Sequence, residues 1–328
     1  MDSVTQKAKK KGTKSINISR RSFLAGFTAA AAAPAAFAKL KSDPDLAVLL
    51  SDVHVNGVEG KDMYQRGKFM RVVAEILKMD PLPGHAIFFG DLAWLHGRKE
   101  DYVSSSEGIK MLQDAGIHVT LGMGNHDRRS TFLEVHPSYL KTTKIPGRIV
   151  SVVDLGRADF IMLDGLQGTD DRGLTEMGPG GGAFDKAQQD WLMDVLPKWK
   201  RPVFVGSHWP IREIKVGGKP IVQLFFRSPS VAGYIHGHDH RWYKTISIRS
   251  WGDSRQIRGL CLPSTGHWGD IGYATLRLSK DRAVVSLRQY EYYFPSPIAT
   301  DEKCTDMWRD ITAENQNQTC TFRLPTCA

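Results

Sequence analysis

Cysteine is scarce in this sequence, with four residues in 328, and the apolar stretch within the first 38 residues is shorter than the roughly 20 residues of a membrane-spanning helix. A glycine-rich run at 178–182 lacks the Lys-Ser/Thr pair of a phosphate-binding P-loop. No internal repeat is evident. Hydrophobic residues make up 41% of the chain and charged residues 24%, which is typical of globular proteins.

The first 38 residues differ from the rest of the chain. A Lys-rich start precedes residues 19–24, in which Arg20 and Arg21 are followed by Phe and Leu, and an Ala-rich stretch ends in Ala-Phe-Ala at 36–38. This order is that of a signal peptide and resembles the bacterial twin-arginine export signal, with cleavage after Ala38. An uncut N-terminal anchor is the alternative. We therefore expect a periplasmic or secreted protein, exported folded by the twin-arginine machinery, with no stable membrane span after cleavage.

The apparent basicity of the chain comes from this leader. It holds seven of the 44 basic residues and one of the 35 acidic ones, so the remaining chain carries a net charge near +3 instead of +9. No nucleic-acid partner is expected, and a secreted nuclease is disfavoured.

All four cysteines follow the leader, three of them within the last 25 residues: Cys261, Cys304, Cys320 and Cys327. This placement suits an oxidising compartment, so we expect two disulfides. The spacing does not decide their pairing, since four cysteines allow three connectivities. Free buried thiols are the alternative.

Five short apolar runs recur along the chain, each followed by a turn rich in Gly, Asp, Asn or His; they are 46–50, 86–89, 117–121, 202–205 and 231–235. Their continuous apolarity predicts strands covered on both faces. Amphipathic segments between them predict helices at 63–79, 102–115 and 185–199, the last with Asp185 as N-cap. This alternation implies parallel strands, whose carboxyl ends gather reactive groups.

Closely spaced runs after residue 240 predict an antiparallel set of strands at 243–248, 256–262, 273–278 and 283–290. A similar hairpin is expected at 150–153 and 160–163. The organisation predicted from these patterns is a signal peptide at 1–38, an α/β domain at 39–294, and a loop-rich tail with cysteines at 295–328.

The ends of the first five runs carry polar residues with metal-binding side chains, which are Asp52, His54, Asp91, Asn125, His126, Asp127, His208, His238 and His240. Two pairs are spaced i, i+2, which in extended backbone points both side chains the same way. A single such pair is weak evidence. Five ends in order are stronger, because chance would have to place the right donors after every strand of one sheet.

Carboxylate, amide and imidazole donors together suit Mn, Fe or Zn better than Ca or Mg, which favour shells of oxygen alone. Because no cysteine lies in the cluster, a structural zinc knot is disfavoured. The donors exceed what one ion can use. We therefore expect two divalent or trivalent ions that share a bridging carboxylate.

The order of these blocks, D-x-H, G-D, G-N-H-D, a later H and G-H-x-H, resembles that of the calcineurin-like metallophosphoesterase superfamily. The resemblance runs from Asp52 to His240 and so covers most of the chain beyond the leader. It implies an α/β fold in which two sheets of mixed parallel and antiparallel strands form an αββα sandwich.

The resemblance also implies a role for each residue. One metal would be held by Asp52, His54 and His240. The other would be held by Asn125, His208 and His238, with Asp91 bridging the two. His126 would act on the leaving-group oxygen, and Asp127 would orient it from behind.

The implied activity is hydrolysis of a small phosphorylated substrate by metal-activated hydroxide, without a covalent enzyme intermediate. Trp94 stands where purple acid phosphatases carry a tyrosine ligand, and the block ending in Asp127 looks more like phosphodiesterase branches. We expect phosphodiesters slightly ahead of monoesters. A metal-binding or ligand-binding protein without turnover, on the same fold, is the alternative.

Overall fold

The computed structural model describes residues 42–57, 64–167, 181–249, 256–293 and 318–326. The expected signal peptide at 1–38 lies outside the described residues and stays a prediction. Within the described ranges, none of the helices combines the length and apolarity needed to cross a lipid bilayer.

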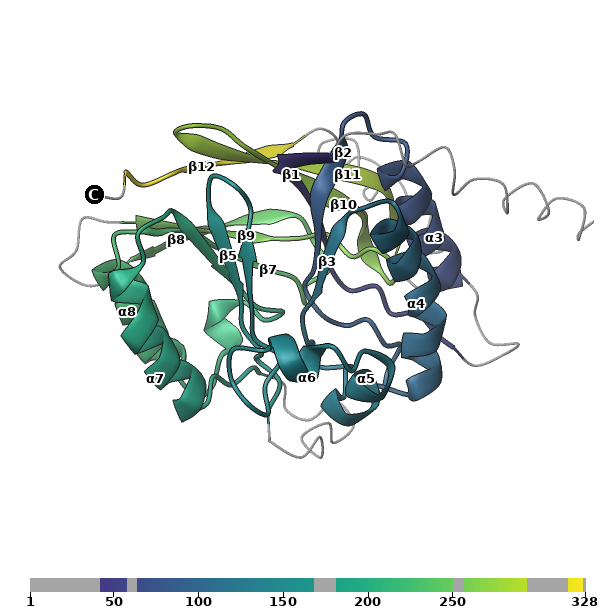
Figure 1. Cartoon of the computed structure of the whole chain (residues 1–328), viewed down its shortest axis with the longest axis horizontal. Helices are drawn as coiled ribbons and strands as arrows, with labels where there is room; N and C mark the ends of the chain where they lie inside the picture. The colour runs from purple at the N-terminus through teal and green to yellow at the C-terminus, as the bar shows by residue number, and fades with distance from the viewer. Residues whose placement is uncertain (1–41, 58–63, 168–180, 250–255, 294–317, 327–328) are drawn as a thin grey trace, which may run out of the picture. The chain divides into compact units, whose positions relative to one another are not determined.

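Two six-stranded sheets form the centre of the fold (Figure 1). The first has the order β12-β11-β10-β1-β2-β3, with bounds β1 Ser42–Leu50, β2 Leu82–Phe88, β3 His118–Leu121, β10 Gly269–Leu278, β11 Arg282–Tyr293 and β12 Thr319–Arg323. The second has the order β4-β5-β6-β7-β9-β8, with bounds β4 Ser151–Asp154, β5 Asp159–Met162, β6 Val203–Gly206, β7 Val231–His236, β8 Tyr243–Arg249 and β9 Gln256–Cys261. The strand pairs β1–β2, β2–β3, β5–β6 and β6–β7 are parallel.

Helices cover the outer faces of both sheets (Figure 1). α3 (Tyr64–Ile76) and α4 (Lys99–Asp114) lie beside the first sheet, and α7 (Lys186–Val195) and α8 (Gly218–Arg227) beside the second. In β2, Ile87 belongs to the core between the sheets, whereas the ring of Phe88 lies 6.0 Å from that of Phe69 in α3. Both faces of this strand are therefore buried, which explains the continuous apolar run at 86–89.

The predicted fold class, an αββα sandwich of mixed strands, is confirmed. The five runs form β1, β2, β3, β6 and β7, and the early hairpin forms β4 and β5 as an antiparallel pair. The N-cap is also confirmed, since the Asp185 carboxylate accepts a hydrogen bond from the Gln188 N–H at 3.0 Å.

Two predictions about strand partners were wrong. The five runs do not share one sheet, because β1 to β3 lie in the first and β6 and β7 in the second. The late runs do not form one antiparallel set either: β8 and β9 extend the second sheet, with β9 parallel to β7, while β10 lies antiparallel to β1. Apolar alternation shows that a strand is half buried but carries no information about which sheet it joins.

Several helical elements were not predicted as such from the sequence. They are α5 (Arg129–Val135), α6 (Tyr139–Thr142), the 3₁₀ turns η2 (Leu196–Lys198) and η3 (Ile211–Glu213), and the longer α8. α8 opens with Gly-Lys-Pro, and proline is tolerated in the first turn of a helix. Ile221, Leu224 and Phe225 recur at helical spacing and are buried, a signal from which this helix could have been predicted.

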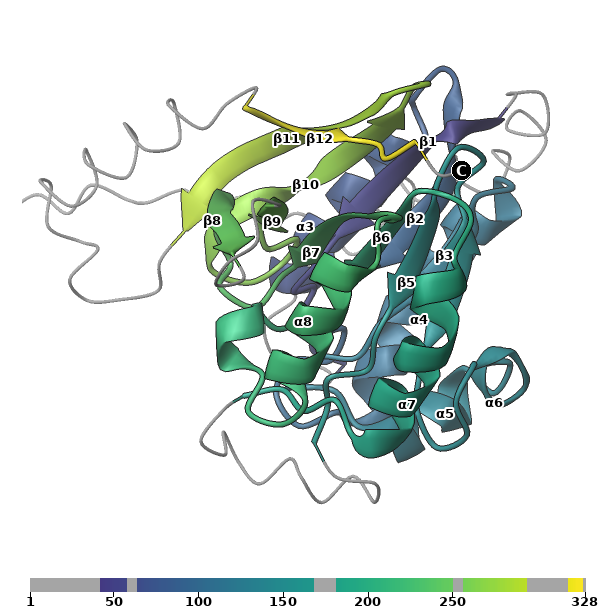
Figure 2. The same ribbon diagram turned by 90° about the vertical axis from the view of Figure 1, so that its left-hand side faces the viewer.

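The tail is not wholly loop. Residues Thr319–Arg323 form β12, which pairs antiparallel with β11 at the edge of the first sheet (Figure 2). Its residues alternate, with Cys320 and Phe322 buried and their neighbours exposed. Cys261 and Cys320 are buried free thiols, so the two predicted disulfides find no support among the described residues. Cys304 and Cys327 lie outside those residues.

Replacing Phe322 with alanine should lower the free energy of unfolding by about 3–5 kcal/mol, the usual cost of emptying a buried aromatic site. The ring of Phe322 lies 5.3 Å from that of Phe204, and an ideal Cβ on Gly233 would come within 2.5 Å of it. Thr321→Ala, on the exposed face of the same strand, is the control and should stay within about 0.5 kcal/mol of wild type. Urea unfolding measures both; equal stability of the two variants would show that β12 contributes nothing to the core.

Candidate metal centre

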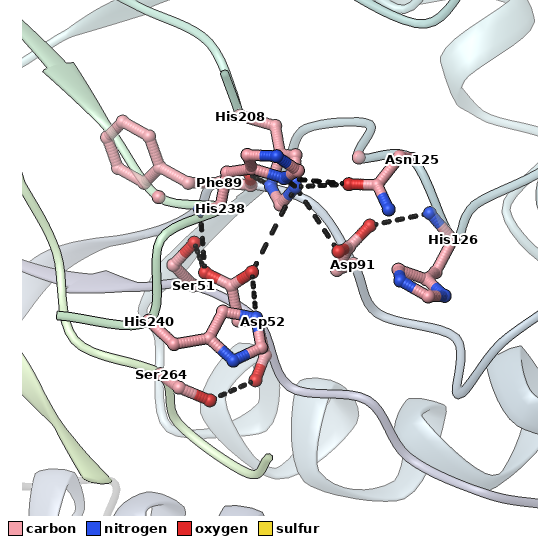
Figure 3. A network of polar contacts seen from close by, with 12 residues as sticks. Ser51, Asp52, Phe89, Asp91, Asn125, His126, His208, His238, His240 and Ser264 are labelled. Carbon is pink, nitrogen blue, oxygen red and sulfur yellow. Dashed lines mark hydrogen bonds and ion pairs between the residues drawn. The ribbon is translucent and has the colours of Figure 1, made fainter. Parts of the chain in front are cut away.

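The polar residues that follow β1, β2, β3, β6 and β7 meet at one end of the two sheets. Figure 3 shows the side chains of Asp52, Asp91, Asn125, His208 and His238 directed toward one another from separate loops. The structure therefore brings together donors that lie up to 188 positions apart in the sequence, as Asp52 and His240 do.

The first group consists of Asp52, His54 and His240, whose ligand atoms all lie within 4.8 Å of one another. The Oδ1 atom of Asp52 is 3.0 Å from Nε2 of His240 and 3.9 Å from Nε2 of His54. All three side chains are buried. This is the set that the family resemblance implied for one metal.

The second group consists of Asn125, His208 and His238. The amide oxygen of Asn125 lies 2.9 Å from Nε2 of His208 and 2.9 Å from Nδ1 of His238, and these two nitrogens are 3.1 Å apart. One oxygen and two nitrogens thus form a compact triangle.

Asp91 lies between the two groups. Its Oδ2 atom is 3.5 Å from Nε2 of His54 and 3.2 Å from Nε2 of His208, so one oxygen faces a member of each group. Its Oδ1 atom accepts a hydrogen bond from the backbone N–H of His126 at 2.8 Å. This placement is the one that a bridging carboxylate requires.

Main-chain carbonyls orient three of the histidines. The Nδ1 atom of His54 lies 3.1 Å from the Trp94 carbonyl, that of His208 2.9 Å from the Phe89 carbonyl, and that of His240 3.0 Å from the Trp268 carbonyl. A carbonyl can only accept, so each Nδ1 carries the proton and each Nε2 presents a lone pair to the cluster.

The backbone at the site is left-handed. Within the described part of the chain, five non-glycine residues have a positive φ, and all five were predicted ligands: Asp52, His54, Asp91, His238 and His240. Left-handed φ is uncommon outside glycine and concentrates at functional sites. The explanation of the i, i+2 pairs by extended backbone was therefore wrong, because tight left-handed turns direct these side chains.

Two glycines, Gly124 and Gly237, allow the loops that carry the predicted ligands to pack closely against one another. An ideal Cβ on Gly237 would lie 1.8 Å from Oγ of Ser51, and one on Gly124 would lie 2.1 Å from Oδ1 of Asp91. No side chain fits at either position. The glycines of the G-N-H-D and G-H-x-H blocks are thus required by the packing of one metal loop against another.

The charges in the site fit cations. Burial would raise the pKa of Asp52, but in the absence of metal ions positive charge on His240 and His208 holds it below its ordinary value; positive charge on His208 and His126 likewise outweighs burial at Asp91. Metal ions bound to the lone pairs of the neutral rings would supply the same positive charge. Burial is also the main cause that lowers the pKa of His54. No Lys or Arg among the described residues forms an ion pair with either carboxylate, and Oδ1 of Asp52 and Nε2 of His54 have no hydrogen-bond partner. Buried lone pairs and carboxylates of this kind suit two bound metal ions.

His126 and Asp127 occupy different surroundings. The ring of His126 is partly exposed at the edge of the cluster, with Nδ1 3.1 Å from the Leu95 carbonyl and its centroid 4.9 Å from that of His54 (Figure 3). The Asp127 carboxylate is fully buried and accepts hydrogen bonds from the N–H groups of Leu92, Ala93 and Gly124 and from the Tyr102 hydroxyl. Asp127 thus links the loop that follows β2 to the loop that follows β3. The His126 ring is oriented by its contact with the Leu95 carbonyl, not by Asp127.

A further group, His236, Asp239 and Cys261, also has its ligand atoms within 4.8 Å of one another. Nδ1 of His236 and Sγ of Cys261 both contact the Gly237 carbonyl, and Asp239 accepts from Arg212, whereas Nε2 of His236 is buried without a hydrogen-bond partner among the described residues. We interpret it as structural support behind the G-H-x-H loop.

Some contributors were missed by the sequence reasoning. Ser264 donates from its hydroxyl to the Asp52 carbonyl at 2.9 Å, and Ser51 donates to Oδ2 of Asp52 at 2.5 Å. Glu213 lies with Oε2 3.1 Å from Nε2 of His238, and this bond holds the pKa of Glu213 below its ordinary value. Ser51 directly precedes the predicted ligand Asp52, so its role could have been predicted from the sequence. Glu213 and Ser264 lie outside all five motif blocks, and nothing in the sequence pointed to them.

The chain is similar to known proteins in sequence and in fold. Residues 47–242 match the family described as calcineurin-like phosphoesterase. Among solved structures, a dimetal phosphatase from Danio rerio is similar at 18% identity and a TM-score of 0.56, covering 76% of this chain and 97% of that one. A predicted phosphoesterase from Streptococcus pneumoniae has 12% identity and a TM-score of 0.34, covering 76% and 93%. No curated protein matches the sequence.

Replacing Asp91 with asparagine should lower metal binding at both positions, because its carboxylate faces both groups. The loss should reach at least the about 10- to 100-fold in affinity that is typical of residues one step further from a metal. Elemental analysis after equilibrium dialysis measures the ions bound per chain. Asp190→Asn, an exposed carboxylate paired with Lys186 on α7, is the control and should bind as wild type does. Two ions held by the Asp91 variant with unchanged affinity would contradict the bridging assignment.

Proposed function

The chain belongs to the calcineurin-like phosphoesterase family, and on that premise we propose that it is a two-metal hydrolase of phosphate esters. The observation that carries the proposal is the position of Asp91, with one oxygen facing both groups of donors. A single ion could not use all seven donors, whereas a pair sharing one carboxylate uses them all.

Each metal position has its own set of residues in this proposal. Asp52, His54 and His240 hold one ion, Asn125, His208 and His238 hold the other, and Asp91 holds both. When bound, such ions lower the pKa of a coordinated water molecule and neutralise charge on the phosphoryl oxygens. The protein contributes a dry and fixed arrangement of ligands, since the carboxylates and most of the histidines are buried.

His126 is proposed to act on the leaving group. The Nδ1–H of His126 donates to the Leu95 carbonyl and fixes the ring, which leaves Nε2 to face the departing oxygen. As a general acid the ring acts in its doubly protonated form: Nε2 gives its proton to the leaving group, and Nδ1 keeps the proton that it shares with Leu95. The partial exposure of His126, in contrast to the buried His54 and His208, suits contact with a substrate that arrives from solvent. Asp127 supports this role only through the loops that its carboxylate joins.

Phosphodiesters are proposed slightly ahead of monoesters as substrates. The support is the aspartate at position 127 of the G-N-H-D block, which resembles phosphodiesterase branches of the family. The similar Danio rerio structure carries the name dimetal phosphatase, which agrees with the class of reaction.

His126→Ala should reduce kcat by about 10²- to 10⁴-fold, the range expected for a general acid, while the protein still binds two metal ions. Bis-p-nitrophenyl phosphate and p-nitrophenyl phosphate are the probes, assayed on protein of measured metal content. His118→Ala, an exposed histidine at the opposite end of β3, serves as the control and should retain full activity. Activity that survives a chelator would refute the metal mechanism, and metal binding without turnover in the wild type would favour the non-catalytic alternative.

We also propose that the protein is exported through its twin-arginine signal. In a bacterial host, the chain recovered from the periplasmic or extracellular fraction should begin at Lys39, as N-terminal sequencing would show. Changing Arg20 and Arg21 together to lysine should abolish export and leave the full-length chain in the cytoplasm. Lys10→Gln with Lys11→Gln, outside the motif, is the matched control. Unprocessed membrane-bound chain would instead indicate an uncut anchor.

A further inference from the structure

His238 is held differently from the other histidines of the centre. His54, His208 and His240 each face a main-chain carbonyl through Nδ1 and present Nε2 to the cluster. His238 is reversed: its Nδ1 lies 2.9 Å from the Asn125 amide oxygen, and its Nε2 lies 3.1 Å from the Glu213 carboxylate. A charged acceptor therefore takes the place that a neutral carbonyl has at the other three.

His238 is also the most accessible of these histidines. Its side chain is 23% exposed, compared with 1% for His54 and 6% for His240. Packing alone therefore restrains its ring less than it restrains the others. Its backbone is left-handed, with φ at 71°. A ring in this position needs a specific partner at Nε2 to keep Nδ1 directed at Asn125 and His208.

Glu213 is well placed to be that partner. It ends the 3₁₀ turn η3, which begins three residues after His208, and its N–H donates to the Pro210 carbonyl at 2.9 Å. Arg212 then joins this turn to the G-H-x-H loop, since its guanidinium lies 3.2 Å from Glu213 and 2.7 Å from Asp239. The segment that supplies His208 thus also supplies the carboxylate that holds His238, so two donors of one group are positioned together.

We propose that Glu213 is a positioning residue that fixes the ring of His238 and strengthens Nδ1 as a metal donor. A carboxylate that accepts a hydrogen bond from the imidazole N–H makes the opposite ring nitrogen a better metal ligand than a carbonyl acceptor does. Glu213 accordingly sets the affinity of the Asn125–His208–His238 group and leaves the Asp52–His54–His240 group unchanged. The inference rests on the proposed metal centre but not on hydrolysis of a phosphate ester.

The test is titration of metal-free protein with Mn²⁺ or Zn²⁺, followed by calorimetry and elemental analysis. Glu213→Ala should weaken one of the two binding events about 10- to 100-fold and leave the other as in wild type. Glu213→Gln, which keeps an acceptor but loses the charge, should fall between the two. Glu134→Ala, which breaks an exposed pair with Lys99, is the matched control and should bind both ions normally.

Thermal unfolding of the metal-free variants separates positioning from general support. The midpoint for metal-free Glu213→Ala should equal that of metal-free wild type. Unchanged binding of both ions would overturn the proposal, and so would equal weakening of both events together with a lowered midpoint. A protein that binds two ions in a Glu213-dependent way, yet hydrolyses no ester, would refute the proposed function and leave this inference intact.

Discussion

The rest of the structure depends on the burial of two carboxylates among histidines. Within the described residues, neither carboxylate forms an ion pair with a lysine or an arginine. Asp52 and Asp91 have almost no contact with solvent, and a buried negative charge without compensation is strongly unfavourable. Neighbouring imidazoles lower the pKa values of both groups and so favour the charged forms. Cations bound between them would complete this compensation, which is why a metal centre accounts for the arrangement better than a purely structural cluster.

The sandwich serves this centre by bringing strand ends from two sheets to the same place. β1, β2 and β3 supply Asp52, Asp91 and Asn125 from one sheet, and β6 and β7 supply His208 and His238 from the other. A hydrogen bond joins the loops of the two sheets: the backbone N–H of His238 donates to Oδ2 of Asp52 at 3.1 Å. The packing of the core therefore sets the separation of the donors.

The fold class and the residues of the cluster could be predicted from the sequence because both leave local signals in it. Asp, Asn and His residues stand directly after each apolar run and can be recognised one block at a time. The run at 86–89 is continuously apolar because one face of β2 packs against the second sheet and the other against α3. The partners of β8 to β11 were not readable, since pairing is a long-range property. The left-handed backbone at Asp52 and His238 was missed because non-glycine residues seldom adopt it, and Glu213 because its contact depends on how η3 meets another loop.

In each of the two buried carboxylates, one oxygen accepts a hydrogen bond from the main chain of a neighbouring loop. Asp91 accepts from the N–H of His126, and Asp52 accepts from the N–H of His238. Only the second oxygen of each can turn toward a cation. The positions of these two remaining oxygens are consequently set by the main chain of the loops rather than by free rotation of the side chains. Oxygens held at a fixed separation would favour ions of a matching radius and coordination geometry, so selectivity among metals would be built into the loops before any substrate arrives.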